Sequence, residues 1–191
     1  MNIVSSYILN MLAYMIFAAP FIIVLRFIMV QMLNVKNIQT TLLHEIFCVI
    51  FIVFIIGLAS QTILPDFHLE NDTSDINLEL FKIFRQTYYT LFVQHYWSYF
   101  LINFLGNILI FIPIGFFMPL LWKKFENGFL TVFFGFSVSL FIEISQLFLP
   151  RRTDVDDLWL NTLGALIGYL IFLIIKFIFP ETVKKSRLYK K

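Results

Sequence analysis

The sequence predicts an all-α, multi-pass membrane protein: a transmembrane helix bundle of about five spans with one additional helix at the membrane interface. Two observations predict this fold class. Hydrophobic residues make up 60% of the chain and charged residues only 14%, and several apolar runs reach about 18 residues, the length that crosses a bilayer. Because these runs and their connections occupy nearly all of the 191 residues, no separate globular catalytic domain fits beside them.

The apolar runs place two spans within residues 1–65 and three within residues 101–180. The first span contains Pro20, which a membrane helix tolerates because neighbouring groups satisfy the freed backbone atoms. Other prolines end spans, since proline cannot donate a helical hydrogen bond. The expected spans cover residues 7–30, 43–64, 101–122, 128–149 and 158–179, and Pro65, Pro150 and Pro180 end the second, fourth and fifth of them.

Residues 66–100 connect the second span to the third and are expected on the extracytoplasmic side. Their first part, DFHLENDTSDINLE, is rich in Asp, Asn, Ser and Thr, which is typical of a solvated loop. Their second part, QTYYTLFVQHYWSYF, carries Tyr, Trp and His at a density typical of the lipid headgroup region. We therefore expect one interfacial helix over residues 86–100.

The distribution of basic residues predicts the orientation. Lys and Arg are concentrated on the cytoplasmic side of membrane proteins, so the basic tail over residues 181–191 is expected in the cytoplasm. An odd number of spans then places the N-terminus outside the cell. Arg151 and Arg152 would lie outside as well, and we interpret them as partners of the neighbouring aspartates.

Each of the last three spans carries one face of small and polar residues. Polar groups are costly against hydrocarbon, and small residues let helix backbones approach closely, so the three faces are expected to meet. Gly164 and Gly168 in particular form the spacing for close helix contact. The faces comprise Asn103 and Asn107; Gly135, Ser139, Glu143 and Gln146; and Asp157, Asn161, Gly164 and Gly168.

Glu143 is the most informative residue of these faces because of its depth. It lies seven residues before Pro150, which places it about 10 Å below the outer end of its helix. An unpaired carboxylate there costs about 3 kcal/mol, so Glu143 needs a partner, a proton or a water-filled cavity. Arg151 or Arg152 could fold back onto Glu143 or Asp157. Such a network would either form a functional polar site or only fix the register of the helices, and the sequence leaves both readings open.

Two segments, NFLGNILIFIPIGF and FIEISQLFLPRRTDVDDLWLNTLGALIGY, resemble the VanZ-like family of bacterial membrane proteins. The resemblance covers roughly the C-terminal half, and Pro150 and Arg152 depart from the family pattern. That pattern is an Asn-rich start with Pro-x-Gly, then Glu-x-x-Gln, then Arg, Asp, Asp-Asp, Asn and Gly-x-x-x-Gly. It matches Asn103, Gly106, Asn107, Pro113, Gly115, Glu143, Gln146, Arg151, Asp154, Asp156, Asp157, Asn161, Gly164 and Gly168.

The resemblance implies a cell-envelope protein that lowers susceptibility to lipoglycopeptide antibiotics, teicoplanin in particular, through an outward-facing polar site. Its expected partners are membrane lipids and a lipoglycopeptide or a lipid-linked envelope precursor, with no nucleic acid. Glu143 and Asp157 are the candidate catalytic residues. The candidate binding residues are Asn103, Asn107, Gln146, Arg151, Arg152, Asp154, Asp156 and Asn161.

The alternative is an intramembrane enzyme that acts on a lipid or a lipid-linked cell-wall precursor. Glu143 would then be the general base, while Asp154, Asp157 and Asn161 would hold a divalent cation and Arg151 would bind phosphate. No activated Ser, Cys or His and no intramembrane-protease motif supports this alternative. The single cysteine, Cys48, also excludes a cysteine-based metal site. The sequence thus identifies no cofactor.

Overall fold

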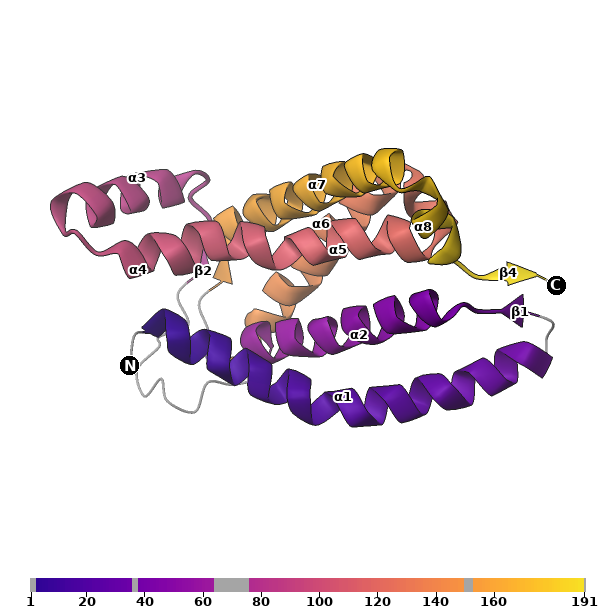
Figure 1. The fold of residues 1–191 in the computed structure, drawn as a ribbon. Coiled ribbons are helices and arrows are strands. Elements are labelled where there is room, and N and C mark those ends of the chain that lie inside the picture. The colour runs from indigo at the N-terminus through magenta and orange to yellow at the C-terminus, as the bar shows by residue number, and fades with distance from the viewer. Residues whose placement is uncertain (1–2, 36–37, 64–75, 150–152, 191) are drawn as a thin grey trace.

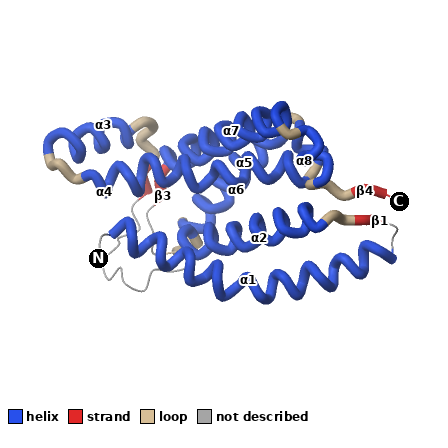
Figure 2. The backbone as a smooth tube through the Cα atoms, in the orientation of Figure 1, coloured by secondary structure: helices blue, strands red, loops and turns tan. Residues whose placement is uncertain are grey.

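The computed structural model describes residues 3–35, 38–63, 76–149 and 153–190, and these are almost entirely helical (Figures 1 and 2). Five of the described helices are long and apolar enough to cross a membrane, which confirms the predicted bundle. They are α1 (Ile3–Val35), α2 (Leu42–Thr62), the third span Trp97–Leu121, α6 (Gly128–Gln146) and α7 (Val155–Ile178).

The third span is a continuous helix of three parts. It begins as α4 (Trp97–Tyr99), widens into the π-helix η2 (Phe100–Gly106) and continues as α5 (Asn107–Leu121). Pro113 and Pro119 both lie inside α5 without ending it. π-Helical turns are rare and frequently occur at functional sites, which makes η2 notable.

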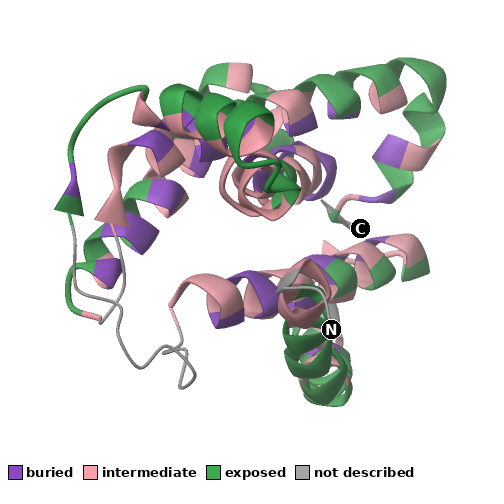
Figure 3. Cartoon of the chain, turned by 90° about the vertical axis from the view of Figure 1, so that its left-hand side faces the viewer, coloured by how far each residue is buried: buried purple, intermediate pink, exposed green. Residues whose placement is uncertain are grey.

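Helix α5 lies at the centre of the bundle and packs against α2, α6 and α7, whereas α1 packs along α2 (Figure 1). The main apolar core lies between α2, α5 and α6 and includes Phe51, Phe111, Ile114 and Ile142. Helix α1 is largely exposed on its outer side, as Figure 3 shows for the helix that starts at the N-terminus. Its exposed apolar side chains are those expected of a helix that faces lipid.

Helix α7 approaches α5 closely at the two predicted glycines. A Cβ on Gly164 would lie 2.1 Å from the backbone oxygen of Ile108, and one on Gly168 would lie 2.0 Å from that of Ile112. Because backbone atoms cannot yield as a flexible side chain can, any larger residue would push the helices apart. The predicted close contact at Gly164 and Gly168 is therefore confirmed.

The aromatic stretch over residues 86–100 differs in extent from the expected interfacial helix. Helix α3 (Lys82–Tyr88) continues as the π-helix η1 (Tyr89–Val93) and ends in a turn, where His95 has a φ of 52°. Trp97 already belongs to the third span. The Tyr99 hydroxyl donates to Gln86 Oε1 at 2.6 Å and holds the two arms of this hairpin together.

Two short strand pairs join distant segments at opposite ends of the bundle. Strand β2 (Ile76–Asn77) pairs in parallel with β3 (Thr153–Asp154), and β1 (Ile38–Gln39) pairs antiparallel with β4 (Tyr189–Lys190). We call the end with residues 76–83, 143–149 and 153–161 the motif end, and the end with residues 38–44, 119–127 and 179–190 the tail end. The two termini lie at these opposite ends (Figure 1).

The tail end is closed by the 3₁₀ turn η3 (Lys123–Glu126) and by α8 (Pro180–Lys185) with the residues after it. Buried His44 on α2 places Nδ1 2.7 Å from the backbone oxygen of Ser186, while the Ser186 hydroxyl donates to the Leu120 oxygen at 3.1 Å. The segment after α8 therefore joins the start of α2 to the end of α5.

Candidate functional site

Glu143 lies in the last turns of α6 with 7% of its surface exposed. Its Oε2 accepts a hydrogen bond of 3.1 Å from the backbone N–H of Asp154, the N-cap residue of α7. A carboxylate at this position is stabilised by the partial positive charge of the helix N-terminus. Because α6 ends at Gln146 instead of residue 149, Glu143 lies closer to the end of its helix than predicted, and its buried carboxylate meets the start of α7.

Asp154 joins the start of α7 to strand β2. Its Oδ1 accepts from the backbone N–H of Asp156 at 3.0 Å and from Asn77 Nδ2 at 2.8 Å. Asn77 is 5% exposed, and its own Oδ1 accepts from Lys82 Nζ at 3.1 Å. Sequence reasoning missed Asn77 because it lies in a polar loop, where no helical spacing marks a shared face.

Asp157 faces the third span. Asn107 Nδ2 donates both to Asp157 Oδ1 and, at 3.0 Å, to the backbone oxygen of Asn103. Asn103 Nδ2 donates to the Tyr99 backbone oxygen at 3.1 Å within the π-helical stretch. The amide face of the third span and the acidic face of α7 therefore meet as the sequence predicted. We call Asn77, Asn107, Glu143, Asp154 and Asp157 the motif cluster.

Two further predicted residues join helices close to the motif cluster. Buried Asn161 donates through Nδ2 to Ser139 Oγ at 2.9 Å, which pairs α7 with α6. The Asn161 Oδ1 atom is buried, and no described residue donates to it. Gln146 Nε2 donates to the Thr62 backbone oxygen at 3.1 Å and connects α6 to the last turn of α2.

Asp156 has a different environment from the other aspartates because it is fully buried. Its Oδ1 accepts from the Phe81 N–H at 2.6 Å and from Trp159 Nε1 at 2.8 Å, and its Oδ2 accepts from the Ile83 N–H at 2.8 Å. These donors hold the start of α3 against α7. Asp156 thus positions the hairpin that begins with α3, and both of its carboxylate oxygens already accept hydrogen bonds from these groups.

The proposed partners Arg151 and Arg152 lie outside the described residues, as does Pro150, so their pairing with Glu143 or Asp157 stays a prediction. Asn77 donates to Asp154 and Asn107 donates to Asp157. Among the described residues, no group of His, Cys, Asp and Glu side chains is arranged to hold a metal ion.

A cavity of about 390 Å³ adjoins the motif cluster and lies between α1, α2 and the third span. Its wall is mainly apolar, and Asn107 is one of its polar residues. Asn107 therefore belongs both to the motif cluster and to the cavity wall. The polar residues of the wall are Tyr7, Gln61, Thr62 and Asn107, and its apolar ones include Val4, Ile8, Met11, Leu101, Leu105 and Ile110.

The sequence model of the VanZ/LLP1 family matches residues 43–176, which run from α2 to the last turn of α7 and include every described residue of the motif cluster. No curated protein and no solved structure matches the chain. Because the match covers more than half of the sequence, the chain is a multi-pass membrane protein that belongs to the VanZ/LLP1 family.

Proposed function

We propose that this protein binds a lipid-bearing molecule of the cell envelope at the motif end and thereby lowers susceptibility to lipoglycopeptide antibiotics such as teicoplanin. The motif cluster carries this proposal: side chains and backbone groups from β2, α5, α6 and the start of α7 form two hydrogen-bonded groups, Glu143–Asp154–Asn77 and Asn107–Asp157, at the same end of the bundle. Polar and ionisable groups within a membrane protein are costly, and where they gather they mark sites for polar ligands or ions.

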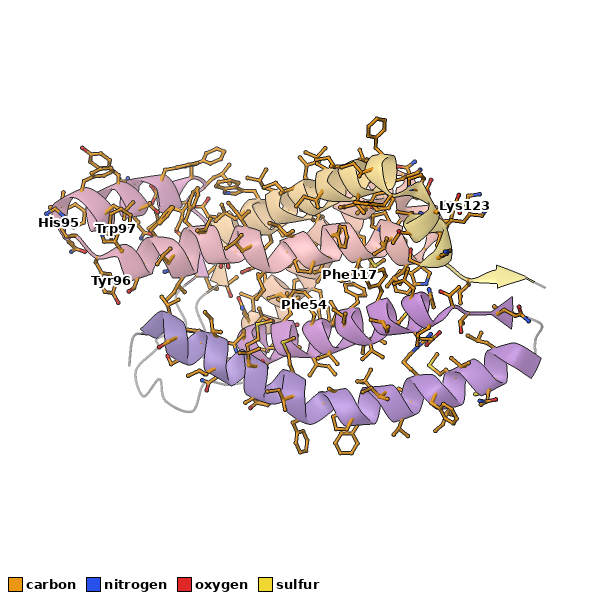
Figure 4. The ribbon with its side chains drawn as sticks, in the orientation of Figure 1. Phe54, His95, Tyr96, Trp97, Phe117 and Lys123 are labelled. Carbon is orange, nitrogen blue, oxygen red and sulfur yellow. The ribbon has the colours of Figure 1, made fainter. Side chains whose placement is uncertain are left out.

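The proposed orientation places the motif end outside a bacterial cell membrane and the tail end in the cytoplasm. Basic residues gather at the tail end, as expected of the cytoplasmic side. Figure 4 shows Lys123 at that end, whereas His95, Tyr96 and Trp97 form the tip of the hairpin at the opposite end. The described basic residues of the tail end are Lys123, Lys124, Lys184, Lys185, Arg187 and Lys190.

Susceptibility of a bacterial strain that expresses the chain tests this proposal. Expression should raise the inhibitory concentration of teicoplanin more than that of vancomycin, because teicoplanin carries a lipid tail. Glu143→Gln keeps an acceptor for the Asp154 N–H but removes the carboxylate charge. This variant should lose the protection while its amount in the membrane stays the same.

Glu79→Gln is the matched control, because it makes the same chemical change on a side chain that is 52% exposed and lies outside the motif cluster. It should retain full protection. If expression of the wild-type chain leaves susceptibility to both drugs unchanged at normal membrane amounts, the proposed function is wrong. If Glu143→Gln and Glu79→Gln protect equally well, the motif cluster plays no part in it.

A further inference from the structure

The cavity between α1, α2 and the third span has the size of a ligand site and the surroundings of a lipid site. Its volume of about 390 Å³ falls within the range of about 300–1,000 Å³ that is typical of small-molecule pockets. All of its lining residues belong to three of the five candidate membrane spans. Hydrocarbon therefore surrounds it, and an apolar cavity does not hold water well.

The wall of the cavity is amphipathic. Ile8 and Met11 of α1 and Leu101 and Leu105 of the third span supply apolar surface. Gln61 and Thr62 supply polar groups at the last turn of α2, which ends at the motif end. A long apolar chain with a polar head would match both kinds of surface, with its head directed to the motif end.

Asn107 joins this wall to the motif cluster. Its Nδ2 is bound to Asp157 and to the Asn103 backbone, so the orientation of the amide is fixed before a ligand enters. The neighbouring residues Leu101, Ile102, Leu105 and Gly106 all belong to the π-helix η2, so the unusual helix itself forms part of the wall. π-Helical turns frequently accompany functional sites.

We propose that this cavity binds one fatty-acyl chain of a membrane amphiphile, whose polar head then lies beside the motif cluster. The inference rests on the proposed function, because it specifies the lipid portion of the ligand. It also goes beyond the family match over residues 43–176, because Val4, Tyr7, Ile8 and Met11 of the wall precede that match. The acyl site is therefore partly built by α1.

Photo-crosslinking of the full chain in lipid nanodiscs tests the proposal directly. The probe is a trace of phosphatidylglycerol with a diazirine in its acyl chain, and the labelled peptides are identified by mass spectrometry. We expect labelling to be concentrated on residues 4–11 and 101–110, which hold most of the wall. Uniform labelling of all lipid-facing helices would overturn the proposal.

A matched pair of variants on α1 gives the test its specificity. Ile8→Trp fills the cavity, whereas Ile16→Trp makes the same change at a position that is 72% exposed and outside the cavity. Because Ile8 is itself 55% exposed, neither variant threatens the fold. The Trp side chain should displace part of the bound acyl chain, and a chain that buries two methylene groups fewer binds about tenfold more weakly. Ile8→Trp should therefore reduce labelling of the wall by about that factor. Ile16→Trp should leave the labelling unchanged. Equal labelling in both variants would overturn the proposal.

Susceptibility of cells that express the same two variants separates this inference from the proposed function. We expect Ile8→Trp to lose the protection against teicoplanin that Ile16→Trp retains. Concentrated labelling of the wall in a chain that gives no protection would support the acyl site and contradict the proposed function. Uniform labelling in a chain that does protect would contradict the acyl site alone.

Discussion

Asn107 donates a hydrogen bond to the carboxylate of Asp157 and so joins the third span to α7. The same amide group also donates to the Asn103 backbone, which directs the acidic face of α7 toward the π-helical stretch. In this contact a donor on one helix and an acceptor on another, far apart in the sequence, form a hydrogen bond within the bundle. Hydrogen bonds to charged groups are stronger than those between neutral groups.

Loss of this contact should destabilise the protein. Asn107→Ala removes the donor and leaves the half-buried Asp157 carboxylate with one partner fewer, which we expect to cost about 1–3 kcal/mol. Thermal unfolding of the purified protein in detergent measures the change. Thr162→Ala is the control, because the Thr162 hydroxyl donates only to its own helix, at the Leu158 oxygen. Equal unfolding temperatures for the two variants would contradict a stabilising role for the Asn107–Asp157 contact.

Replacement of Asp156 should release the hairpin before it affects the rest of the bundle. In Asp156→Asn an amide replaces one carboxylate oxygen, so the Phe81 and Ile83 N–H groups can no longer both be satisfied. Hydrogen–deuterium exchange of residues 78–86 should become faster, while exchange in α5 and α7 stays slow. If exchange of residues 78–86 is unchanged in this variant, the carboxylate does not hold the hairpin. Glu79→Gln is the control: it removes only the exposed ion pair with Arg85 in the same segment, and because exposed ion pairs contribute little, exchange should stay close to that of the wild type.

The features of the fold that depend only on residues close together in the sequence were predictable. The length and hydropathy of the apolar runs determine the spans, and helical spacing correctly placed Glu143, Asn161 and Gly164 on buried faces. These inferences need only the period of a helix and the cost of polar groups in lipid. Span ends shifted by a few residues where caps operate, as at Asp154, whose side chain starts α7 at Val155.

The features that depend on distant contacts were not predictable. The turn at His95 contains neither Gly nor Pro and is held by tertiary contacts such as that between Tyr99 and Gln86. Asn77 reaches Asp154 only because β2 pairs with β3. The cavity likewise depends on how α1 lies against the third span. None of these arrangements leaves a periodic signal in the sequence.

At the tail end, Glu126 should make stability depend on pH. Its Oε2 accepts from Lys176 Nζ at 2.9 Å, and its Oε1 lies 2.5 Å from Arg187 Nη1. Partial burial would raise the pKa of Glu126, but the hydrogen bonds and charges of Lys176 and Arg187 outweigh it and hold the pKa below the usual 4.5. A lowered pKa in the folded state stabilises the protein above the unfolded-state pKa, and this stabilisation is lost as the pH falls through the folded-state value.

The unfolding temperature of the wild type should therefore fall as the pH is lowered from about 5 to 3. Glu126→Gln should already be less stable than the wild type at pH 7, and the difference between the two should shrink over the same interval. Glu181→Gln is the control, because Glu181 is an exposed glutamate at the same end of the bundle, and this variant should follow the wild type. A constant difference between wild type and Glu126→Gln down to pH 3 would show that the charge of Glu126 is not the cause.

The proposed function requires the motif end to face the outside of the cell, and cysteine labelling of intact cells tests this most directly. In a Cys48→Ser background, which removes the single native cysteine, Glu79→Cys reports on the motif end and Lys184→Cys on the tail end. A membrane-impermeant maleimide should label Glu79→Cys in intact cells and Lys184→Cys only after the cells are permeabilised. Labelling of Lys184→Cys in intact cells, with Glu79→Cys protected, would place the motif cluster at the cytoplasmic face and contradict the proposed outward-facing site.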